Sequence, residues 1–475
     1  MRLLLRSIRA FSIFGVIFVS YMVQLGLTRT FRRYERDAET GRERVCDPPF
    51  LIRRRERIDQ RNAKRLLRGI LRLRGVYIKM GQVLSIMGGF LPRVYAKELE
   101  VLQDEVPPMP FSKIAATFIE SVGRRPEDCF RSLDSEPLAA ASLGQVHTAC
   151  LHDGTKVAVK ILYPGIRGVI RTDMRLVRLS LRAYQAFVPV RNLDSVHASL
   201  VDLLRRETDY VHEAACMKRM AANFEDEDDV LIPEVVEELS TSEVLTMTFM
   251  EGIKITRFDE LAAAGVDRSV VARRLTECFY KQLFLHRFFH ADPHPGNFLI
   301  DPGSDPASAP RIVILDFGAI SEVGPNMIEG SIEILSGFFE QNDALVLDGI
   351  ERIGFVAEDG NRDLLRQTVK AYFQKLLKLE ERTVGALMRA SRRELEELRD
   401  PEVERRQLRE LMRSIHYPEG WFYVERAAVL MFWLCGQIDP ELDTMKVGFP
   451  YIMPLVAAHT ANRARASAFV ADSQV

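Results

Sequence analysis

The first hydrophobic pattern is a run without charge between Arg9 and Arg29, AFSIFGVIFVSYMVQLGLT. As a helix it would be about 28 Å long, just enough to cross the hydrocarbon of a bilayer. It predicts a hydrophobic membrane-anchor helix over residues 1–30. More arginines follow the run than precede it, which favours placing the main body on the cytoplasmic side. A helix lying in the membrane interface and a buried core helix are the alternatives.

The pattern then becomes polar and afterwards helical. Residues 31–60, rich in Arg and Glu and containing Pro48-Pro49, read as a polar connector leading into a helix. Residues 61–135 form a predicted helical extension, in which one helix runs through LLRGILRLRGVYIKMGQVLSI with Leu66, Ile70, Leu73, Tyr77 and Leu84 near one face. This helix carries the tetrapeptide Lys79-Met80-Gly81-Gln82.

Strand patterns follow over residues 136–252. The stretch from Pro137 to Leu162 predicts strand, turn and strand, with Asp153-Gly154 at the hairpin. Two more strands are expected between Val230 and Ile255, around a turn at residues 240–242. The segment 249–252, Phe-Met-Glu-Gly, reads as a connector whose backbone could bond an adenine edge.

A long helix is expected over residues 193–222, between these strands. Glu207 falls on its apolar stripe, and a buried acid needs a cationic or polar partner. Glu213 lies on a different face, one turn beyond Asp209. Helical spacing keeps Glu207 and Glu213 from pointing the same way, and either could pair with a lysine of the strand region.

Helices dominate the remainder. We expect one over residues 267–289 and further helices from Pro325 to about residue 440, separated by a flexible hairpin tip at 303–310. The apolar stretch that contains Glu425 and Arg426 has too few unbroken apolar residues to cross a membrane, so it is predicted to be core. A tail of residues 441–475 follows, and its last residues, 461–475, are expected to be disordered.

Composition narrows the class of protein. The chain has 475 residues, is 47% hydrophobic and 28% charged, and carries a formal net charge of −1. These are values of a globular protein, and no excess of basic residues points to nucleic acid. Its 6 cysteines are scattered without a Cys-x-x-Cys pair, which indicates reduced thiols and not a disulfide framework.

The candidate chemistry is concentrated between His286 and Gly318. Asp292 and Asn297 are separated by four residues, and a strand pattern then leads into Asp316-Phe317-Gly318. Carboxylate and amide oxygens at this spacing are typical of phosphotransferases that use a divalent metal. A zinc site from the histidines at 286, 290 and 294 is disfavoured because prolines at 293 and 295 break any helix there. His290 is better interpreted as bracing the loop.

Lys160 supplies the matching cation. It ends the apolar alternation Val157-Ala158-Val159, and its ammonium could reach the α- and β-phosphates of a nucleotide. Where a kinase has a glycine-rich loop, this chain has Ala139-Ala140-Ala141-Ser142. Alanine restricts the backbone, so a loop over phosphates would differ in shape and stiffness.

Together these motifs resemble the UbiB/AarF family of atypical protein-kinase-like proteins over roughly residues 60–440. The motifs occur in the family's order: Lys79-x-Gly81-Gln82, Ala139-Ala140-Ala141-Ser142, Lys160, Glu207-x-Asp209 with Glu213, Asp292-Pro293-x-x-Gly296-Asn297 and Asp316-Phe317-Gly318. The resemblance implies an α+β, bilobal protein-kinase-like fold. It would have a small β-rich N-lobe (136–252), a helical C-lobe (253–440) and the N-terminal extension.

The resemblance also implies roles for the motif residues. Lys160 would contact the phosphates of ATP and pair with an acid, Glu213 being preferred over Glu207. Asn297 and Asp316 would ligate Mg²⁺, and Asp292 would occupy the position of the catalytic base. Lys79 and Gln82 would belong to a cover over the site, close to Glu207 and Asp209. A last group would line the nucleotide site: Ala140, Ala141, Ser142, Met250 and Gly252.

The expected function is that of a membrane-attached, Mg²⁺-dependent ATP-binding kinase-like protein or ATPase. Its partners would be membrane lipid and the enzymes or lipid intermediates of isoprenoid quinone (ubiquinone) biosynthesis, and the function could extend to lipid homeostasis. Two alternatives stay open at this point. One is a phosphotransferase acting on a protein or small molecule, and the other is a non-enzymatic, nucleotide-gated scaffold.

Overall fold

The computed structural model describes residues 2–31, 33–36, 43–46, 48–86, 93–103, 108–185, 193–303, 309–356, 360–367, 418 and 420–472. The chain divides into two compact units. Unit 1 comprises Met1–Glu213 and Val235–Phe249, and unit 2 comprises Ala214–Glu234 and Met250–Val475. The second crossing of the chain, after Phe249, falls in the stretch that the sequence indicates as a connector.

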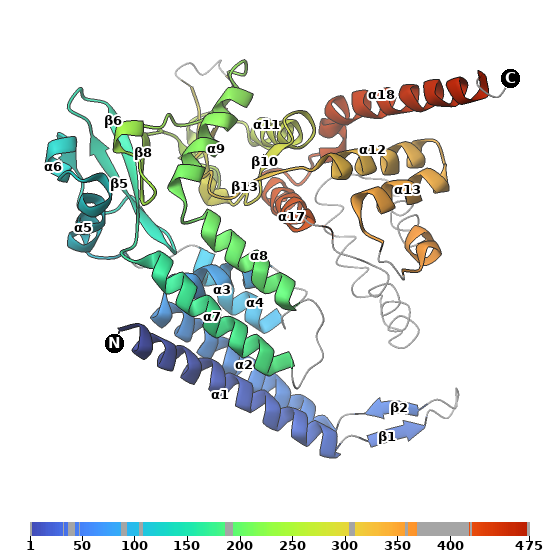
Figure 1. Ribbon diagram of the computed structural model, residues 1–475, viewed down its shortest axis with the longest axis horizontal. Coiled ribbons are helices and arrows are strands. Elements are labelled where there is room, and N and C mark those ends of the chain that lie inside the picture. Colours follow the sequence, from blue (N-terminus) through green and yellow to red (C-terminus); the bar gives the residue numbers. More distant parts are fainter. Residues whose placement is uncertain are drawn as a thin grey trace. The chain divides into compact units, whose positions relative to one another are not determined.

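Unit 1 begins with a helical layer in which α1 lies along α2 (Figure 1). The elements are α1 (Arg2–Phe31), the hairpin β1 (Arg33–Arg36) and β2 (Glu43–Cys46), α2 (Pro49–Leu73), α3 (Val76–Ile86), α4 (Arg93–Leu99) and the 3-10 turn η1 (Glu100–Gln103). Their shared core includes Ala10, Ile70, Tyr77 and Leu99. The single helix expected over residues 66–86 is wrong. Arg74 and Gly75 have φ of 54° and 59°, and this left-handed backbone ends α2 before α3 begins.

The β-sheet of unit 1 has the strand order β3-β5-β6-β8, with β4 also paired to β5. Its strands are β3 (Ser132–Leu133), β4 (Ala139–Ala140), β5 (Gly144–Cys150), β6 (Lys156–Leu162) and β8 (Val244–Thr248), and the helices α5 (Phe111–Val122) and α6 (Pro126–Cys129) precede them. The predicted hairpin is confirmed, since Gly154 at its tip has φ of 94° and Asp153 accepts a hydrogen bond from the Thr155 amide. The side chains of Val157, Val159 and Ile161 on β6 are completely buried.

Three helices complete unit 1: α7 (Ile166–Gln185), α8 (Leu193–Arg206) and α9 (Tyr210–Asn223), which continues into unit 2. The long helix expected over 193–222 is therefore two helices. The hydroxyl of Thr208 bonds back to the Leu204 carbonyl at 2.9 Å, and Asp209 accepts the amide of His212 at 3.2 Å to begin α9. Arg167 of α7 donates to the carbonyl of Thr208 at 2.8 Å and so holds the break.

Unit 2 contains a sheet of order β7-β12-β11-β9 and a separate pair, β10 with β13. The strands are β7 (Val230–Leu231), β9 (Ile253–Lys254), β10 (Phe288–His290), β11 (Phe298–Asp301), β12 (Arg311–Ile314) and β13 (Ile320–Glu322). Strands occur on both sides of residues 240–242 as expected, β7 before them and β8 after them, but these two strands belong to different sheets. β7 joins β12 in parallel in unit 2, and only an isolated bridge from Val235 to Met247 remains beside β8.

The helices of unit 2 surround these strands. They are α10 (Phe258–Ala263), α11 (Arg268–Tyr280), the π-helical turn η3 (Lys281–Leu285), the 3-10 turn η4 (Pro295–Asn297), α12 (Pro325–Phe339), α13 (Asp343–Ile353), α17 (Trp421–Ile438) and α18 (Thr444–Asp472). The helix expected over 267–289 ends at Leu285 and β10 follows. The tip at 304–308 and the helices expected within 368–417 lie outside the described residues.

The predicted disorder of residues 461–475 is wrong as far as Asp472, because α18 continues to that residue. Ile452 and Val456 anchor the helix by burial, and Gly448 lies directly against the ring of Tyr280. Arg463 extends the attachment with an ion pair to Glu340 of α12 at 3.2 Å.

Candidate functional site

Lys160 and Glu213 form a buried ion pair in unit 1. Lys160 lies on β6, and its Nζ is 2.6 Å from Oε1 of Glu213 in the first turn of α9. Glu213 is only 1% exposed, and the ring of Tyr210 lies 5.3 Å from the ammonium. The preference for Glu213 over Glu207 as the partner of Lys160 is confirmed. The pair fixes a lysine that would otherwise be free to rotate at the surface.

A second ion pair joins Lys79 of α3 to Glu207, and both side chains are largely buried. Gln82 lies in α3, three residues after Lys79. Glu207 is the first residue after α8, and Asp209 immediately precedes α9. The motif Glu207-x-Asp209 is thus a turn whose first acid binds the helical extension and whose second acid caps the helix that carries Glu213.

The alanine-rich segment forms a short strand and a tight turn. Ala140 of β4 pairs with Gln145, the amide of Ala141 donates to the carbonyl of Gly144 at 2.9 Å, and Ser142 is buried. A Cβ on Gly144 would lie 2.5 Å from the carbonyl oxygen of Ile161, so only glycine allows β5 to approach β6 here. The turn is therefore fixed by backbone bonds and does not depend on glycine flexibility.

The loop after β10 places Asp292 in unit 2. The amide of Ala291 bonds to the Ala319 carbonyl at 2.7 Å, and His290 Nδ1 accepts the Asp292 amide at 3.2 Å. The backbone amide of His290 also donates to Oε1 of Gln282 at 2.8 Å, so its interpretation as a brace of the loop is confirmed. The side-chain amide of Asn297 donates to the Asp292 carbonyl at 3.0 Å.

Asn297 and Asp316 are brought together by the ends of β11 and β12. The amide of Leu315 donates to the Asn297 carbonyl at 3.0 Å. Asp316 accepts the amide of Gly318 at 2.9 Å, and Phe317 is fully buried. The side-chain nitrogen of Asn297 donates to the Asp292 carbonyl, so the side-chain oxygen of Asn297 is the atom suited to bind a metal.

The donor set fits Mg²⁺. Within the described residues, no three His, Cys, Asp or Glu side chains form a cluster that could hold a metal by themselves. Mg²⁺ needs fewer protein ligands than Zn²⁺ sites do, because it keeps waters and binds phosphate oxygens. One carboxylate and one amide oxygen, Asp316 and Asn297, are such a set.

Arg426 is a site residue that the sequence analysis did not identify. Its Nη2 lies 2.8 Å from Oδ1 of Asp292, and the pair is 7% and 14% exposed. Nε and Nη1 of this arginine are also buried and have no hydrogen-bond acceptor among the described residues. The signal was the charged pair Glu425-Arg426 inside an apolar helix, because a buried charge implies a partner elsewhere in the chain.

The connector places Met250 and Gly252 at the start of the second part of unit 2. A Cβ on Gly252 would lie 2.9 Å from Cβ of Leu299 and 3.0 Å from the carbonyl oxygen of Ile300. The residue must therefore be small for the chain to pass β11.

Comparison with known proteins gives one family. The model of the ABC1 atypical kinase-like domain matches residues 101–348. Protein ACTIVITY OF BC1 COMPLEX KINASE 8, chloroplastic, of Arabidopsis thaliana is 32% identical over 423 residues, which are 83% of this chain and 54% of that protein. An uncharacterized protein of Synechocystis is 29% identical over 402 residues, 84% of this chain and 65% of its own length.

This chain thus spans between half and two thirds of the length of these relatives. Rv3197 of Mycobacterium tuberculosis, solved with erythromycin, covers 83% of this chain and 96% of its own at 24% identity and a TM-score of 0.53, which supports the fold. The family model covers more than half of the chain. The chain therefore belongs to the ABC1 (UbiB/AarF) family and has its kinase-like fold, with a β-sheet N-lobe and a helical C-lobe.

Proposed function

We propose that this protein binds ATP with Mg²⁺ and transfers or hydrolyses its γ-phosphate, as a membrane-attached atypical kinase or ATPase. The observation that carries the proposal is the Lys160–Glu213 pair. In kinases, a strand lysine held by a carboxylate from a helix binds the α- and β-phosphates. The family supports the same activity.

Each site residue has a distinct role in this proposal. Lys160 would bind the phosphates, and Glu213 would keep the ammonium in place. Asp316 and Asn297 would hold Mg²⁺, which neutralises charge on the phosphates. Asp292 would orient the attacking hydroxyl or water. It would have to share or exchange Arg426 to accept a proton, because that guanidinium already occupies Oδ1.

The helical extension is tied to the segment that precedes the helix of Glu213. Lys79 ties α3 to Glu207, three residues before the start of α9, the helix that carries Glu213. A change at α3 would therefore reach the phosphate-binding lysine through a short segment. We expect Lys79→Ala to alter the selectivity for nucleotides or the rate of phosphate release. Unchanged values of both would remove the extension from the mechanism.

The membrane and lipid part of the proposal rests on α1 and on the family resemblance. Among the described residues, the helical segment Arg6–Phe31 is long and apolar enough to cross a membrane. The proposed partners are membrane lipid and enzymes or lipid intermediates of isoprenoid quinone biosynthesis, with the catalytic units facing the cytoplasm or the equivalent compartment.

The proposal is tested by Mg²⁺-dependent binding of ATP to the purified full chain. Asp316→Asn should weaken binding in the presence of Mg²⁺ and have little effect without it. Asp259→Asn, at an exposed position of α10, is the matched control and should bind as the wild type does. Equal binding by all three proteins would overturn the proposal. Full binding without any release of phosphate would instead favour the nucleotide-gated scaffold.

A further inference from the structure

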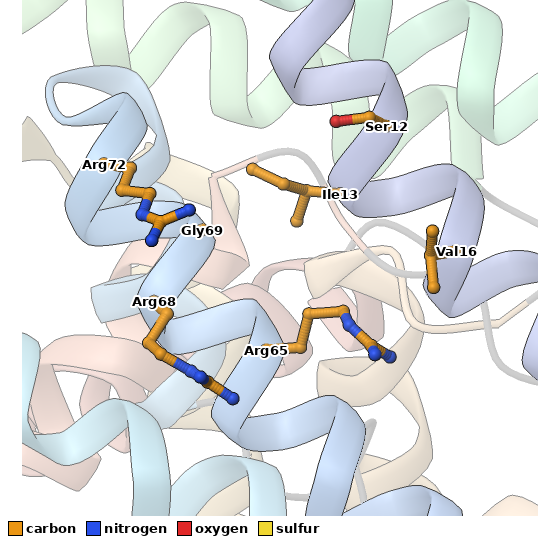
Figure 2. Close-up of a pocket in the computed structure, with 7 residues that line it drawn as sticks. All are labelled: Ser12, Ile13, Val16, Arg65, Arg68, Gly69 and Arg72. Carbon is orange, nitrogen blue, oxygen red and sulfur yellow. The ribbon is translucent and has the colours of Figure 1, made fainter.

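A groove in unit 1 runs between α1 and α2 and has a volume of about 370 Å³ (Figure 2). One wall is formed by Ser12, Ile13 and Val16 of α1 and the other by Arg65, Arg68 and Arg72 of α2. Gly69 forms the floor, where a Cβ would lie 2.6 Å from Cγ2 of Ile13. In Figure 2, Arg65 extends from α2 toward α1, and the groove is mainly apolar on the α1 side and cationic on the α2 side.

Among the described residues, the acceptors recorded for the arginines of the groove are uncharged. Arg65 donates to the side chain of Asn62 at 2.9 Å and Arg68 to the carbonyl of Lys64 at 3.2 Å, and both acceptors are uncharged. Across the residues that the structure describes, no carboxylate forms an ion pair with any of the three. The whole of α2 carries nine basic and two acidic residues. A phosphate would supply the missing charge and match the planar guanidinium groups.

The outer face of α1, beside the groove, is apolar and exposed. Phe11, Val19 and Val23 are 64%, 58% and 48% exposed, and they follow one another at helical spacing with Ile8 and Val16. No part of the described chain covers them. An apolar helix face next to a row of arginines is the combination that binds the interface of an anionic membrane.

The inner face of α1 is attached to the rest of unit 1 through polar groups. Arg6 pairs at 2.7 Å with Asp173, which is completely buried. Asn62 of α2, also fully buried, donates to Ser20 at 2.6 Å, and Gln24 donates to the Leu51 carbonyl at 3.1 Å. If α1 left α2 to cross a bilayer, these groups would lose their partners inside the protein, which costs free energy.

We propose that the α1–α2 groove binds the phosphate headgroup of an anionic phospholipid, while α1 lies in the membrane interface and does not cross the bilayer. The inference rests on the membrane part of the proposed function and gives it a site. The phosphate would contact Arg65 and Arg72, and the acyl chains would lie over the apolar face of α1. A soluble phosphate would use only the arginines and leave that face uncovered.

The test uses the full chain and sedimentation with vesicles of phosphatidylcholine, either alone or mixed with phosphatidylglycerol. The variant R65Q/R68Q/R72Q removes the cations of the groove. The control R124Q/R125Q/R131Q removes the same charge from exposed positions near α6 of unit 1. Each arginine at an anionic surface contributes about a fivefold change in partitioning. We expect the groove variant to lose on the order of 100-fold on phosphatidylglycerol vesicles and the control to lose little.

Two further measurements separate the possible failures. An alkaline carbonate wash should release the wild type from the vesicles, and retention would show that α1 crosses the bilayer, against the inference. Phe11→Asp should weaken partitioning, because it places a charge in the apolar face. Mg²⁺-ATP binding by the same preparations shows that the variants are folded.

The headgroup site would be overturned if vesicle binding did not depend on phosphatidylglycerol and the two triple variants bound equally well. Membrane attachment would survive that result. Absence of any vesicle binding, with normal nucleotide binding, would overturn the site and membrane attachment together. The nucleotide part of the proposed function would survive that result.

Discussion

Arg426 of α17 holds Asp292, the acid that follows β10, through a contact of 2.8 Å between Nη2 and Oδ1. Both side chains are largely buried, so each charge depends on the other for its solvation. The pair links the loop at the proposed reaction centre to a helix that begins at Trp421. α17 therefore sets the orientation of Asp292 as well as forming core.

Breaking this pair should destabilise unit 2. We expect Arg426→Met to lower the free energy of unfolding by about 3–5 kcal/mol, because an unpaired carboxylate stays buried. The double variant Asp292→Asn/Arg426→Met should recover part of the loss, since the residual charge is gone. Denaturant unfolding of the four proteins of this cycle measures the coupling.

Arg463→Met is the matched control for that cycle. Arg463 lies on α18, and the variant breaks its partly exposed ion pair with Glu340 at the end of α12, which should cost less than about 1 kcal/mol. If Arg426→Met lowered the free energy of unfolding by no more than this control does, the contact with Asp292 would not stabilise unit 2.

Glu213 and Glu207 should differ in their effect on nucleotide binding. Glu213→Gln removes the charge that fixes Lys160 and should weaken Mg²⁺-ATP binding about tenfold or more, equivalent to about 1.4 kcal/mol. Glu207→Gln releases Lys79 and leaves the Lys160 pair intact, so affinity should change little. Titration calorimetry on both variants measures this. Equal losses would mean that the two ion pairs act as one unit.

Gly144 should not tolerate a side chain. The Cβ of Gly144→Ala would meet the backbone oxygen of Ile161 at 2.5 Å, so β5 and β6 would have to separate. Such overpacking costs about 1–3 kcal/mol. Gly168→Ala on α7 is the control, because its Cβ meets no atom within 4 Å and alanine favours a helix. Thermal unfolding should show a lower midpoint for the first variant and an equal or higher one for the second.

His147 should make unit 1 less stable in acid. Burial lowers the pKa of His147 below its usual value, against the opposing effect of the Asp134 carbonyl, which its Nδ1 contacts at 2.7 Å. The unfolded chain therefore binds a proton at higher pH than the folded chain does. Stability contributed by this residue is present above about pH 6.5 and falls as the pH drops below it, by at most about 1.4 kcal/mol per pH unit.

Denaturant unfolding at pH 7.5 and pH 5.5 checks this expectation. His147→Gln cannot take up the proton, so its stability should change less between the two pH values than that of the wild type. An identical change in both proteins would assign the acid sensitivity to other groups.

Local patterns predicted the parts of the fold that depend on neighbouring residues. The hairpin at Asp153-Gly154, the strand that ends near Lys160 and the Asp316-Phe317-Gly318 turn all follow from alternation and turn chemistry. The predictions of single, uninterrupted helices over 66–86 and 193–222 were wrong. Helical periodicity continues through Arg74-Gly75 and through 207–209, whereas the breaks depend on backbone conformation and on Arg167 from another helix.

By itself, the sequence determined the family, the order of the motifs and the residue types able to bind phosphate and Mg²⁺. These depend on composition and spacing, which are properties of the chain. Only the tertiary structure decided which charged residues form ion pairs. These pairs are Lys160–Glu213, Lys79–Glu207 and Asp292–Arg426. It also decided which face of α1 is bound and which is exposed. Partner choice among charges far apart in sequence depends on the packing of whole elements, and periodicity carries no information about it.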